Sequence, residues 1–323
     1  MKLSLLSKYR AQLMGVAILL VALFHCTVEH ASEAFDLICF SGDMGVDIFF
    51  LVSGVGMYYA YQKKPTWKEF YIKRLLRIIP AWSIVNLIVL FSTHTISNMD
   101  WVEFFKYMTG ISFWLDGNLY FWYVPAIFCF YLLTPFFMKF YKENKMKAYF
   151  GIGIVWALML GIVVITRKAN YFIFLLRWPV YFVGVLLGEW SFKQVECKKK
   201  NIVVCGIVVT VFWALLEVLK LNLGRPFMRY EYKYILYFFL SISLCILLVY
   251  SMDKVRYEFP ILKFMGSITL EVYLLHEFLL RKITGYIGYV PFDSLGIIFN
   301  ILVFIGTVII AWMFHKILDR VLK

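Results

Sequence analysis

The chain has 323 residues, of which 62% are hydrophobic and only 16% are charged. A soluble globular domain is roughly half apolar, so this composition excludes an ordinary water-soluble fold. The net charge of +13 alone would fit a nucleic-acid-binding protein. However, the basic residues lie in short clusters between long apolar runs, as they do where charge orients helices in a membrane, so we expect no nucleic-acid partner.

The apolar runs indicate the fold class. Each is about 17 to 22 residues long, which is the length of helix that crosses about 30 Å of hydrocarbon. A membrane β-barrel would need short segments of alternating apolar and polar residues, whereas the run IVVCGIVVTVFWALLEVL is apolar on every face. The sequence predicts an all-α integral membrane protein of about ten transmembrane helices, in one domain over residues 1–323 with no fused soluble domain.

Short polar connections separate the predicted transmembrane helices. Their ranges are 12–29, 44–61, 78–95, 121–139, 149–166, 172–190, 201–219, 233–250, 264–283 and 295–316. With both termini in the cytoplasm, the inside loops carry roughly twice as many Lys and Arg residues as the outside loops, so the positive-inside rule predicts that orientation. The first helix follows basic residues as a signal peptide would, but no small-residue cleavage pattern follows it, so we expect it to be retained.

The segment 96–120 lies between the third and fourth predicted helices. It is aromatic, but too many polar residues interrupt it for a crossing. We expect it to lie on the outer surface or to re-enter the membrane, and to roof a cavity. The six cysteines form no CxxC pair and no zinc spacing with histidine, so we predict buried thiols and no metal site.

Two ionisable residues lie within the first two predicted helices. His25 lies in the outer part of the first helix and Asp47 near the outer start of the second. Ionisable groups inside spanning helices are costly, which makes each a functional candidate. Antiparallel neighbours joined by a short loop would place both at a similar depth, where the carboxylate would fix the imidazole tautomer. The pair fits a general base acting on a hydroxyl, and equally a structural hydrogen bond.

Three further polar positions lie within the predicted helices. Ser53, followed by small residues in the second helix, is typical of tight helix packing rather than of substrate contact. Glu271 and His276 lie in GSITLEVYLLHEFL of the ninth helix. Because they are five residues apart, they do not share a helix face and are not expected to be direct partners. An interhelical contact is the simplest interpretation of each.

A basic pair precedes the third predicted helix. Arg74 and Arg77 in KEFYIKRLLRIIP are spaced i and i+3, so both lie on one helix face. Two guanidinium groups one turn apart can each bind a phosphate through two hydrogen bonds. Lipid head groups would satisfy the same pair. Sequence position alone leaves both interpretations open.

Several of these segments occur together in a known order. They are AILLVALFH, GVDIFFLVSG, the KRLLRIIP segment, FWYVPAIFCFYLLTP, RWPVYFVGVLLGEW and SITLEVYLLH. In order and spacing they resemble the acyltransferase 3 family of multi-pass bacterial membrane proteins, over nearly the whole chain. The resemblance implies a membrane O-acyltransferase in the bacterial cytoplasmic membrane. It would move an acyl group, commonly acetyl, from cytoplasmic acyl-CoA to a hydroxyl of a cell-surface glycan, a lipid-linked sugar or a related acceptor.

The resemblance also assigns roles to residues. The family's helix-one histidine corresponds to His25, and its basic RxxR pair corresponds to Arg74 and Arg77. Many members carry an arginine at the position of Met14; here Arg10 lies on roughly the same helix face, about 6 Å lower, and would have to reach upward. We therefore expect His25, oriented by Asp47, to be the base, and Arg74, Arg77 and Arg10 to hold the donor.

The same helices would also suit a protein of another class. Intramembrane ionisable groups on ten helices fit a proton-coupled transporter or flippase, although no pair of broken helices recurs in two halves of the chain. A membrane sensor or assembly partner without chemistry is a third possibility. A carrier should neither hydrolyse acyl-CoA nor release CoA when an acceptor is added.

Overall fold

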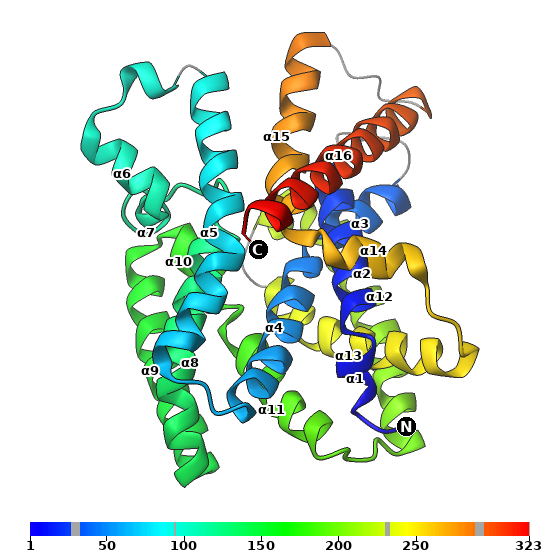
Figure 1. Ribbon diagram of the computed structural model, residues 1–323. Coiled ribbons are helices and arrows are strands. Elements are labelled where there is room, and N and C mark those ends of the chain that lie inside the picture. Colours follow the sequence, from blue (N-terminus) through cyan, green and yellow to red (C-terminus); the bar gives the residue numbers. More distant parts are fainter. Residues whose placement is uncertain (27–32, 94, 230–232, 288–293, 323) are drawn as a thin grey trace.

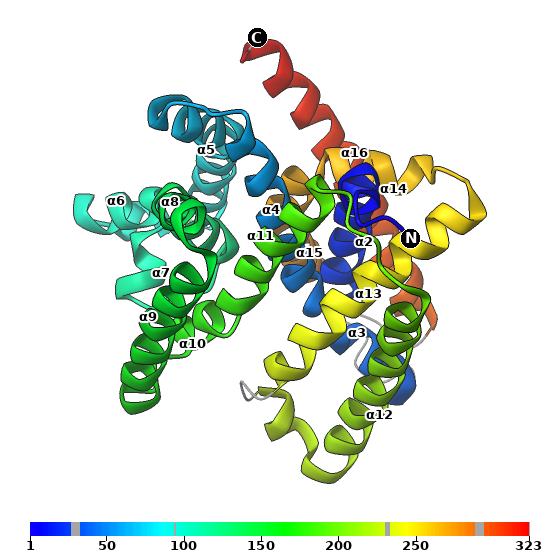
Figure 2. The same cartoon turned by 90° about the horizontal axis from the view of Figure 1, so that it is seen from below.

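The computed structural model describes residues 1–26, 33–93, 95–229, 233–287 and 294–322. Every regular element in these ranges is a helix, and the one β-type pairing among them is an isolated bridge between Lys2 and Glu196. The all-α prediction is confirmed. The helices form a broad assembly in which α5 to α10 lie on one side and α12 to α14 on the other (Figures 1 and 2).

The first half of the chain contains long helices and several short ones. These are α1 (Leu5–Lys8), α2 (Arg10–Phe24), α3 (Glu33–Ser41), α4 (Met44–Gln62), α5 (Trp67–Ser92), the 3-10 turn η1 (Thr95–Asn98), α6 (Trp101–Thr109), α7 (Ile111–Leu115) and α8 (Tyr123–Glu143). The second half contains α9 (Lys145–Thr166), α10 (Ala169–Leu175), α11 (Trp178–Phe192), α12 (Lys199–Arg229), α13 (Lys233–Val255), α14 (Pro260–Ser267), α15 (Thr269–Ile287) and α16 (Ser294–Val321).

The helices match the predicted transmembrane segments. Within the described residues, 8 helices are long and apolar enough to cross a membrane. The other two predicted segments coincide with α2, which is shorter, and with α14 and α15, which carry more charge. The predicted count of about ten is therefore approximate, and positions 27–29 of the first predicted segment lie outside the described residues.

Helix α4 is the centre of the molecule. In the span Ile38–Gln62, 89% of the most apolar stretch is buried inside the protein, against 11% for α9 and α16. Glycines allow this close packing, because a side chain at Gly54 would collide with the α11 backbone and one at Gly184 with the α4 backbone. Gly15 and Gly266 permit the same approach between α2 and α14. The predicted role of the small residues in the second helix as packing positions is confirmed for Gly54.

The basic clusters gather at one end of the molecule. The backbone of Met1 pairs with Cys197 in the α11–α12 loop, and the ammonium of Lys142 lies 4.6 Å above the Tyr61 ring at the end of α4. Lys8 lines a polar cavity with Lys254 in the last turn of α13. Because these clusters were all predicted to be cytoplasmic, the structure brings together the groups that the positive-inside rule places on one side.

A buried carboxylate links helices at the end of the molecule where the basic clusters gather. Glu189 of α11 accepts hydrogen bonds from Tyr141 and Lys145 at the α8–α9 connection, and its Oε1 lies 2.7 Å from the Lys193 ammonium. The bond to Glu189 raises the pKa of Lys193 above its ordinary value. The end of α11 is therefore joined to the connection between α8 and α9 around one charge.

The aromatic segment 96–120 forms short helices. Asp100 caps α6 by accepting a hydrogen bond from the Glu103 amide, and Asn170 and Tyr171 of α10 bind backbone carbonyls of α7. Trp101 is 86% exposed. The segment therefore covers the end of the molecule opposite to the basic clusters, as expected for a surface-lying element.

Candidate functional site

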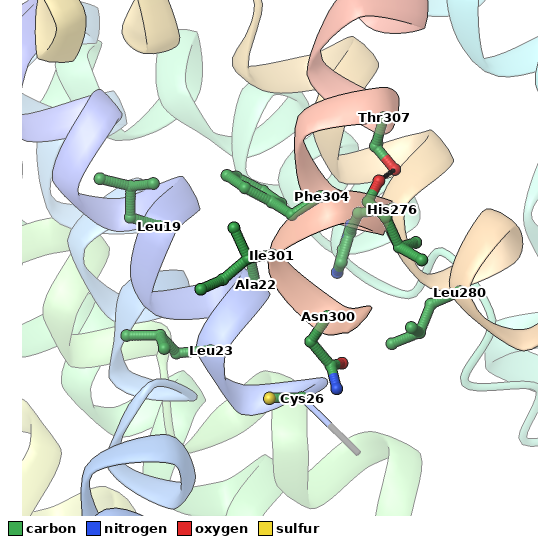
Figure 3. A pocket seen from close by; sticks show the side chains of 11 residues that line it. Leu19, Ala22, Leu23, Cys26, His276, Leu280, Asn300, Ile301, Phe304 and Thr307 are labelled. Atoms are coloured by element: carbon green, nitrogen blue, oxygen red, sulfur yellow. Dashed lines mark hydrogen bonds between the residues drawn. The ribbon is translucent and has the colours of Figure 1, made fainter. Parts of the chain in front are cut away.

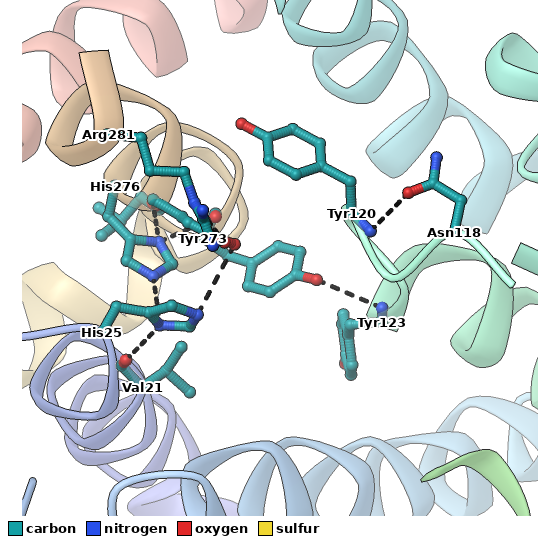
Figure 4. Close-up of polar contacts among 10 residues, drawn as sticks. Val21, His25, Asn118, Tyr120, Tyr123, Tyr273, His276 and Arg281 are labelled. Carbon is teal, nitrogen blue, oxygen red and sulfur yellow. Dashed lines mark hydrogen bonds and ion pairs between the residues drawn. The ribbon is translucent and has the colours of Figure 1, made fainter. Parts of the chain in front are cut away.

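Two histidines meet where α2 ends against α15. His25 follows the last residue of α2, and its Nδ1 lies 3.0 Å from Nε2 of His276. The two rings meet edge to face with centroids 4.7 Å apart. Figure 4 shows both imidazoles beside Tyr273, which lies on the same helix as His276, with Tyr123 of α8 across from them. Two candidates that are 251 positions apart thus form one cluster.

The hydrogen bonds determine the tautomers of this pair. Nδ1 of His276 lies 3.1 Å and 2.9 Å from the carbonyl oxygens of Val272 and Tyr273, so it carries the proton and donates. Its Nε2 is then an acceptor when the ring is neutral. Nδ1 of His25 must donate, because it faces both this acceptor and the Val21 carbonyl at 2.8 Å. Nε2 of His25 therefore keeps its lone pair, as a general base requires.

A carboxylate stands next to that lone pair. Oε2 of Glu277 lies 3.6 Å from Nε2 of His25, while Oε1 accepts hydrogen bonds from Nε and NH2 of Arg281 at 2.9 and 2.7 Å. The arginine fixes the carboxylate with one oxygen directed toward the histidine. A negative charge at this distance stabilises the imidazolium that forms when His25 takes a proton.

The predicted pairing of Asp47 with His25 is wrong. Asp47 is fully buried, and its Oδ2 lies 3.5 Å from Nε of Arg177 in α11. The same guanidinium contacts Asp43 at 2.8 Å, and Lys233 contacts the other oxygen of Asp43 at 2.9 Å. Similar depth in the membrane did not bring Asp47 to His25, because α4 turns Asp47 toward α11 rather than toward the end of α2.

This buried network has a structural role. Two carboxylates and two cations neutralise one another, and Arg177 also lies 4.8 Å and 4.2 Å from the ring centroids of Trp122 and Tyr234. It joins α4, α11 and α13, because Asp43 and Arg177 directly precede α4 and α11 and Lys233 begins α13. Removing one partner would leave an uncompensated buried charge, which is strongly destabilising.

The three predicted donor-binding arginines converge. Arg10 lies within electrostatic range of both Arg74 and Arg77, although it precedes them by more than sixty positions. Arg74 is held by the Phe70 carbonyl at 2.7 Å and lies 3.8 Å from the Phe70 ring centroid. Three like charges gathered inside a membrane protein repel one another, so the cluster is suited to a polyanion.

Gly56 makes room for the first of these arginines. A Cβ atom at Gly56 would lie 2.7 Å from the guanidinium carbon of Arg10. Ser53, one turn earlier on α4, is buried and contacts the phenol of Tyr123 rather than a charged group. The small residues of α4 thus provide helix contact at Gly54 and space for Arg10 at Gly56.

Aromatic residues occupy the interval between the arginines and the histidines. Tyr123 lies in electrostatic range of Arg10 and Arg77, and its backbone N–H donates to the Tyr273 hydroxyl at 3.2 Å. The Tyr273 ring lies 6.2 Å from the His276 ring. The hydroxyl of Tyr273 accepts from Tyr123 and keeps its own proton for another acceptor.

Glu271 lies apart from this cluster. Its carboxylate binds Nδ1 of His315 in α16 at 2.7 Å, while His276 faces His25. Glu271 and His276 are therefore not direct partners, as their spacing on the helix indicated. The contact fixes α16 against α15.

An apolar cavity of about 330 Å³ adjoins the histidine pair between α2, α15 and α16. Leu23, Phe304 and the edge of His276 line it, as Figure 3 shows. The polar side chains of Asn300 and Thr307 donate to carbonyls of their own helix. The walls therefore present mainly apolar atoms, which suits a hydrocarbon group.

The sequence analysis missed Glu277, Arg281 and Tyr273. Glu277 follows His276 directly, and its spacing of four residues to Arg281 is the helical ion-pair pattern, so this signal was available. Tyr273 lies one turn before His276 on the same helix. Tyr123 is half-buried, and its backbone contacts the Tyr273 hydroxyl.

These features define a multi-pass helical membrane protein with a histidine pair and an arginine cluster, separated by tyrosines. A family model described as an acyltransferase domain matches residues 13–316. The chain belongs to the acyltransferase 3 family, and the resemblance of its motifs is confirmed. Comparisons with curated proteins and with solved structures find no match. Among the described residues, no group of three or more His, Cys, Asp or Glu side chains could hold a metal ion.

Proposed function

We propose that this membrane acyltransferase takes its acyl group from acyl-CoA, with Arg10, Arg74 and Arg77 holding the phosphates of the donor. Arg10 lies within electrostatic range of both Arg74 and Arg77, which supports a ligand with several negative charges. They lie toward the end where the basic clusters gather. Acyl-CoA would therefore enter from the cytoplasm, and the acyl group, which we take to be acetyl, would reach inward past the tyrosines.

In this proposal His25 is the general base. Its Nε2 takes the proton of an acceptor hydroxyl, and the oxygen attacks the thioester carbonyl. The C–S bond breaks, and the leaving thiolate recovers the proton from the imidazolium to give free CoA. Glu277 stabilises the imidazolium, and the free hydroxyl proton of Tyr273 could be donated to the carbonyl oxygen as charge develops there. The acceptor is a glycan, a lipid-linked sugar or a related hydroxyl compound.

One geometry carries the proposal: with the tautomers assigned above, no described residue donates to the lone pair of His25 Nε2, and Oε2 of Glu277 lies 3.6 Å from that nitrogen. A histidine pair with only a structural role would not need a carboxylate beside this ring nitrogen. A proton-coupled carrier remains the alternative. It predicts no CoA release when acceptor is added.

The donor site is tested by conservative substitution. Arg74→Lys and Arg77→Lys keep the charge but remove the bidentate fork, so acyl-CoA affinity should fall by roughly one to two decades. If the two arginines bind lipid head groups instead, the Lys variants should behave like the wild type, and only the Ala variants should show weaker binding. Acyl-CoA binding is measured on detergent-purified protein at fixed ionic strength, with Lys68→Ala in α5 as a control for charge loss. Equal affinity of the wild type, Lys and Ala variants would overturn the donor site.

A further inference from the structure

A second cavity lies at the end opposite to the basic clusters. It has a volume of about 430 Å³ and lies between the end of α5, the 96–120 segment and α15. Tyr107, Asn118 and Tyr120 form its wall on the side of the aromatic segment, and Arg281 and Lys282 form the wall on α15. The expectation that this segment roofs a cavity is confirmed. The volume is within the range of small-molecule sites.

A small recess shares the wall formed by Tyr107, Asn118 and Tyr120. It has room for about one water-sized group and is lined by Trp82 and Asn86 of α5. The indole N–H of Trp82 is buried and has no hydrogen-bond partner among the described residues, and Trp82 is 3% exposed. A buried donor without a partner is costly, so this recess is suited to a ligand oxygen that accepts from the indole.

The charge of the cavity wall is positive. Of the described residues that line it, two are cations and none is acidic. The Lys282 ammonium donates to the Ser92 carbonyl, which leaves two of its three donors for a ligand. Tyr107 and Tyr120 add aromatic surface, on which the C–H face of a sugar ring can pack. Cations, rings and hydroxyl-binding groups together are the chemistry that recognises an acidic carbohydrate.

The cavity adjoins the histidine pair. Arg281 lines the cavity and also holds Glu277, whose other oxygen faces His25 Nε2. Tyr120 lies in electrostatic range of both Glu277 and Arg281. Figure 4 shows Tyr120 across the intervening space from Arg281 and the histidines. A hydroxyl of a molecule bound here would lie close to the base.

We propose that this cavity is the acceptor site and that the acceptor is a sugar carrying an anionic group, either a carboxylate or a phosphate. The assignment rests on the proposed function, because it takes the histidine pair as the place where the hydroxyl reacts. The anionic group binds at Lys282, the ring packs on the tyrosines, and a hydroxyl accepts from Trp82. Lys282 is then a binding residue and determines specificity for charged over neutral acceptors.

Binding of simple probes tests the site without any donor. Methyl glucuronide, glucose 1-phosphate and the neutral methyl glucoside are titrated into detergent-purified full-length protein by calorimetry. We expect at least one anionic probe to bind about tenfold more tightly than the neutral one, and Lys282→Gln to remove that preference. Lys263→Gln is the matched control, since Lys263 is exposed and pairs with Glu258 outside the cavity.

Location is tested by protection. Thr93→Cys places a thiol at the cavity wall, and the preferred anionic probe should slow its labelling by a membrane-impermeant maleimide above the background of the native cysteines. The site would be overturned if all three probes bind with equal affinity, or if none binds. It would also be overturned if both lysine variants lose the preference for anionic probes equally, or if the probe does not protect the thiol from labelling. Preference for only one anion distinguishes carboxylate from phosphate. The probe titrations contain no acyl-CoA, so they do not depend on the outcome of the donor-binding test with Arg74→Lys. Failure of the donor site and failure of the acceptor site can therefore be told apart.

Discussion

In the proposed mechanism, the chemistry depends on His25. His25→Ala should lower acyl transfer by about 10²- to 10⁴-fold, the usual contribution of a general base, while insertion and abundance stay near those of the wild type. A single imidazole at a helix end can be lost without making the hydrocarbon region polar. Transfer is measured as acceptor-dependent CoA release.

His315→Ala is the matched control for His25→Ala. It also removes one imidazole, but from the contact with Glu271 that fixes α16, and should leave transfer largely unchanged. If His25→Ala retains full activity, or if both variants lose it equally, His25 is not the base.

The two carboxylates near the first helices should behave differently. Glu277→Gln keeps its shape but removes the charge beside His25, so kcat should fall roughly tenfold or more with little change in stability. Asp47→Asn removes a charge that faces Arg177, so it should lower thermal stability and leave the kcat of the folded protein close to that of the wild type. The measurements are kcat and detergent-solution melting for each variant. The reverse result would return the orienting role to Asp47.

Much of the site was visible in the sequence because ionisable residues stand out in apolar helices. His25, Arg74 and Arg77 were identified on that ground and through the motif resemblance, and they lie where chemistry can use them. The partner of His25 was not predictable, because hydropathy gives the depth of a residue and not the neighbour that its helix face meets. His276 reaches His25 from α15, and nothing local to either residue encodes that contact.

At the scale of elements, two glycines on α4 have different roles. Gly54 allows α4 to pack against α11, whereas Gly56 leaves space for Arg10 of the proposed donor site. Gly56→Ala puts a methyl group 2.7 Å from the Arg10 guanidinium, so it should displace that side chain and weaken acyl-CoA binding by about tenfold. Gly54→Ala instead meets the α11 backbone and should reduce folded yield. The readouts are acyl-CoA affinity and the yield of monodisperse protein.

Gly153→Ala is the control for both substitutions, because no atom lies within 4 Å of the added methyl group. It should leave affinity and yield unchanged. If Gly56→Ala binds acyl-CoA as tightly as Gly153→Ala, Arg10 has no part in the donor site.

The long apolar helices were predictable element by element, since a spanning helix needs a continuous apolar run. The ends of the helices were harder to predict. Helix α5 begins at Trp67, and α2, the first predicted transmembrane segment, is short and flanked by charge. The pairing of α4 with α11 and of α2 with α14 depends on glycine faces that are not adjacent in sequence. Hydropathy therefore predicts that a helix forms, whereas the shape of the helix surfaces decides which helices pack together.

For the whole molecule, the gathering of basic clusters at one end predicts its orientation. A cysteine at Lys199 should be labelled only by reagents that reach the cytoplasm, whereas one at Trp101, which is 86% exposed in α6, should react from outside. Labelling of intact cells and of opened membranes is compared with the parent protein. Reversal at either position would contradict the orientation and would place the acceptor cavity on the wrong side of the membrane.

The pairing of Met1 and Leu3 with the α11–α12 loop sets an order of events during synthesis. At about 5 to 20 residues per second, roughly 10 to 40 seconds pass before Val195 and Cys197 have been made. The packing partner of α2, the segment around Leu262 in α14, is made later still. The beginning of the chain, with Arg10 among its first residues, therefore waits in the membrane for contacts that the second half of the protein supplies. Its residence there is a natural point for a chaperone or insertase to act.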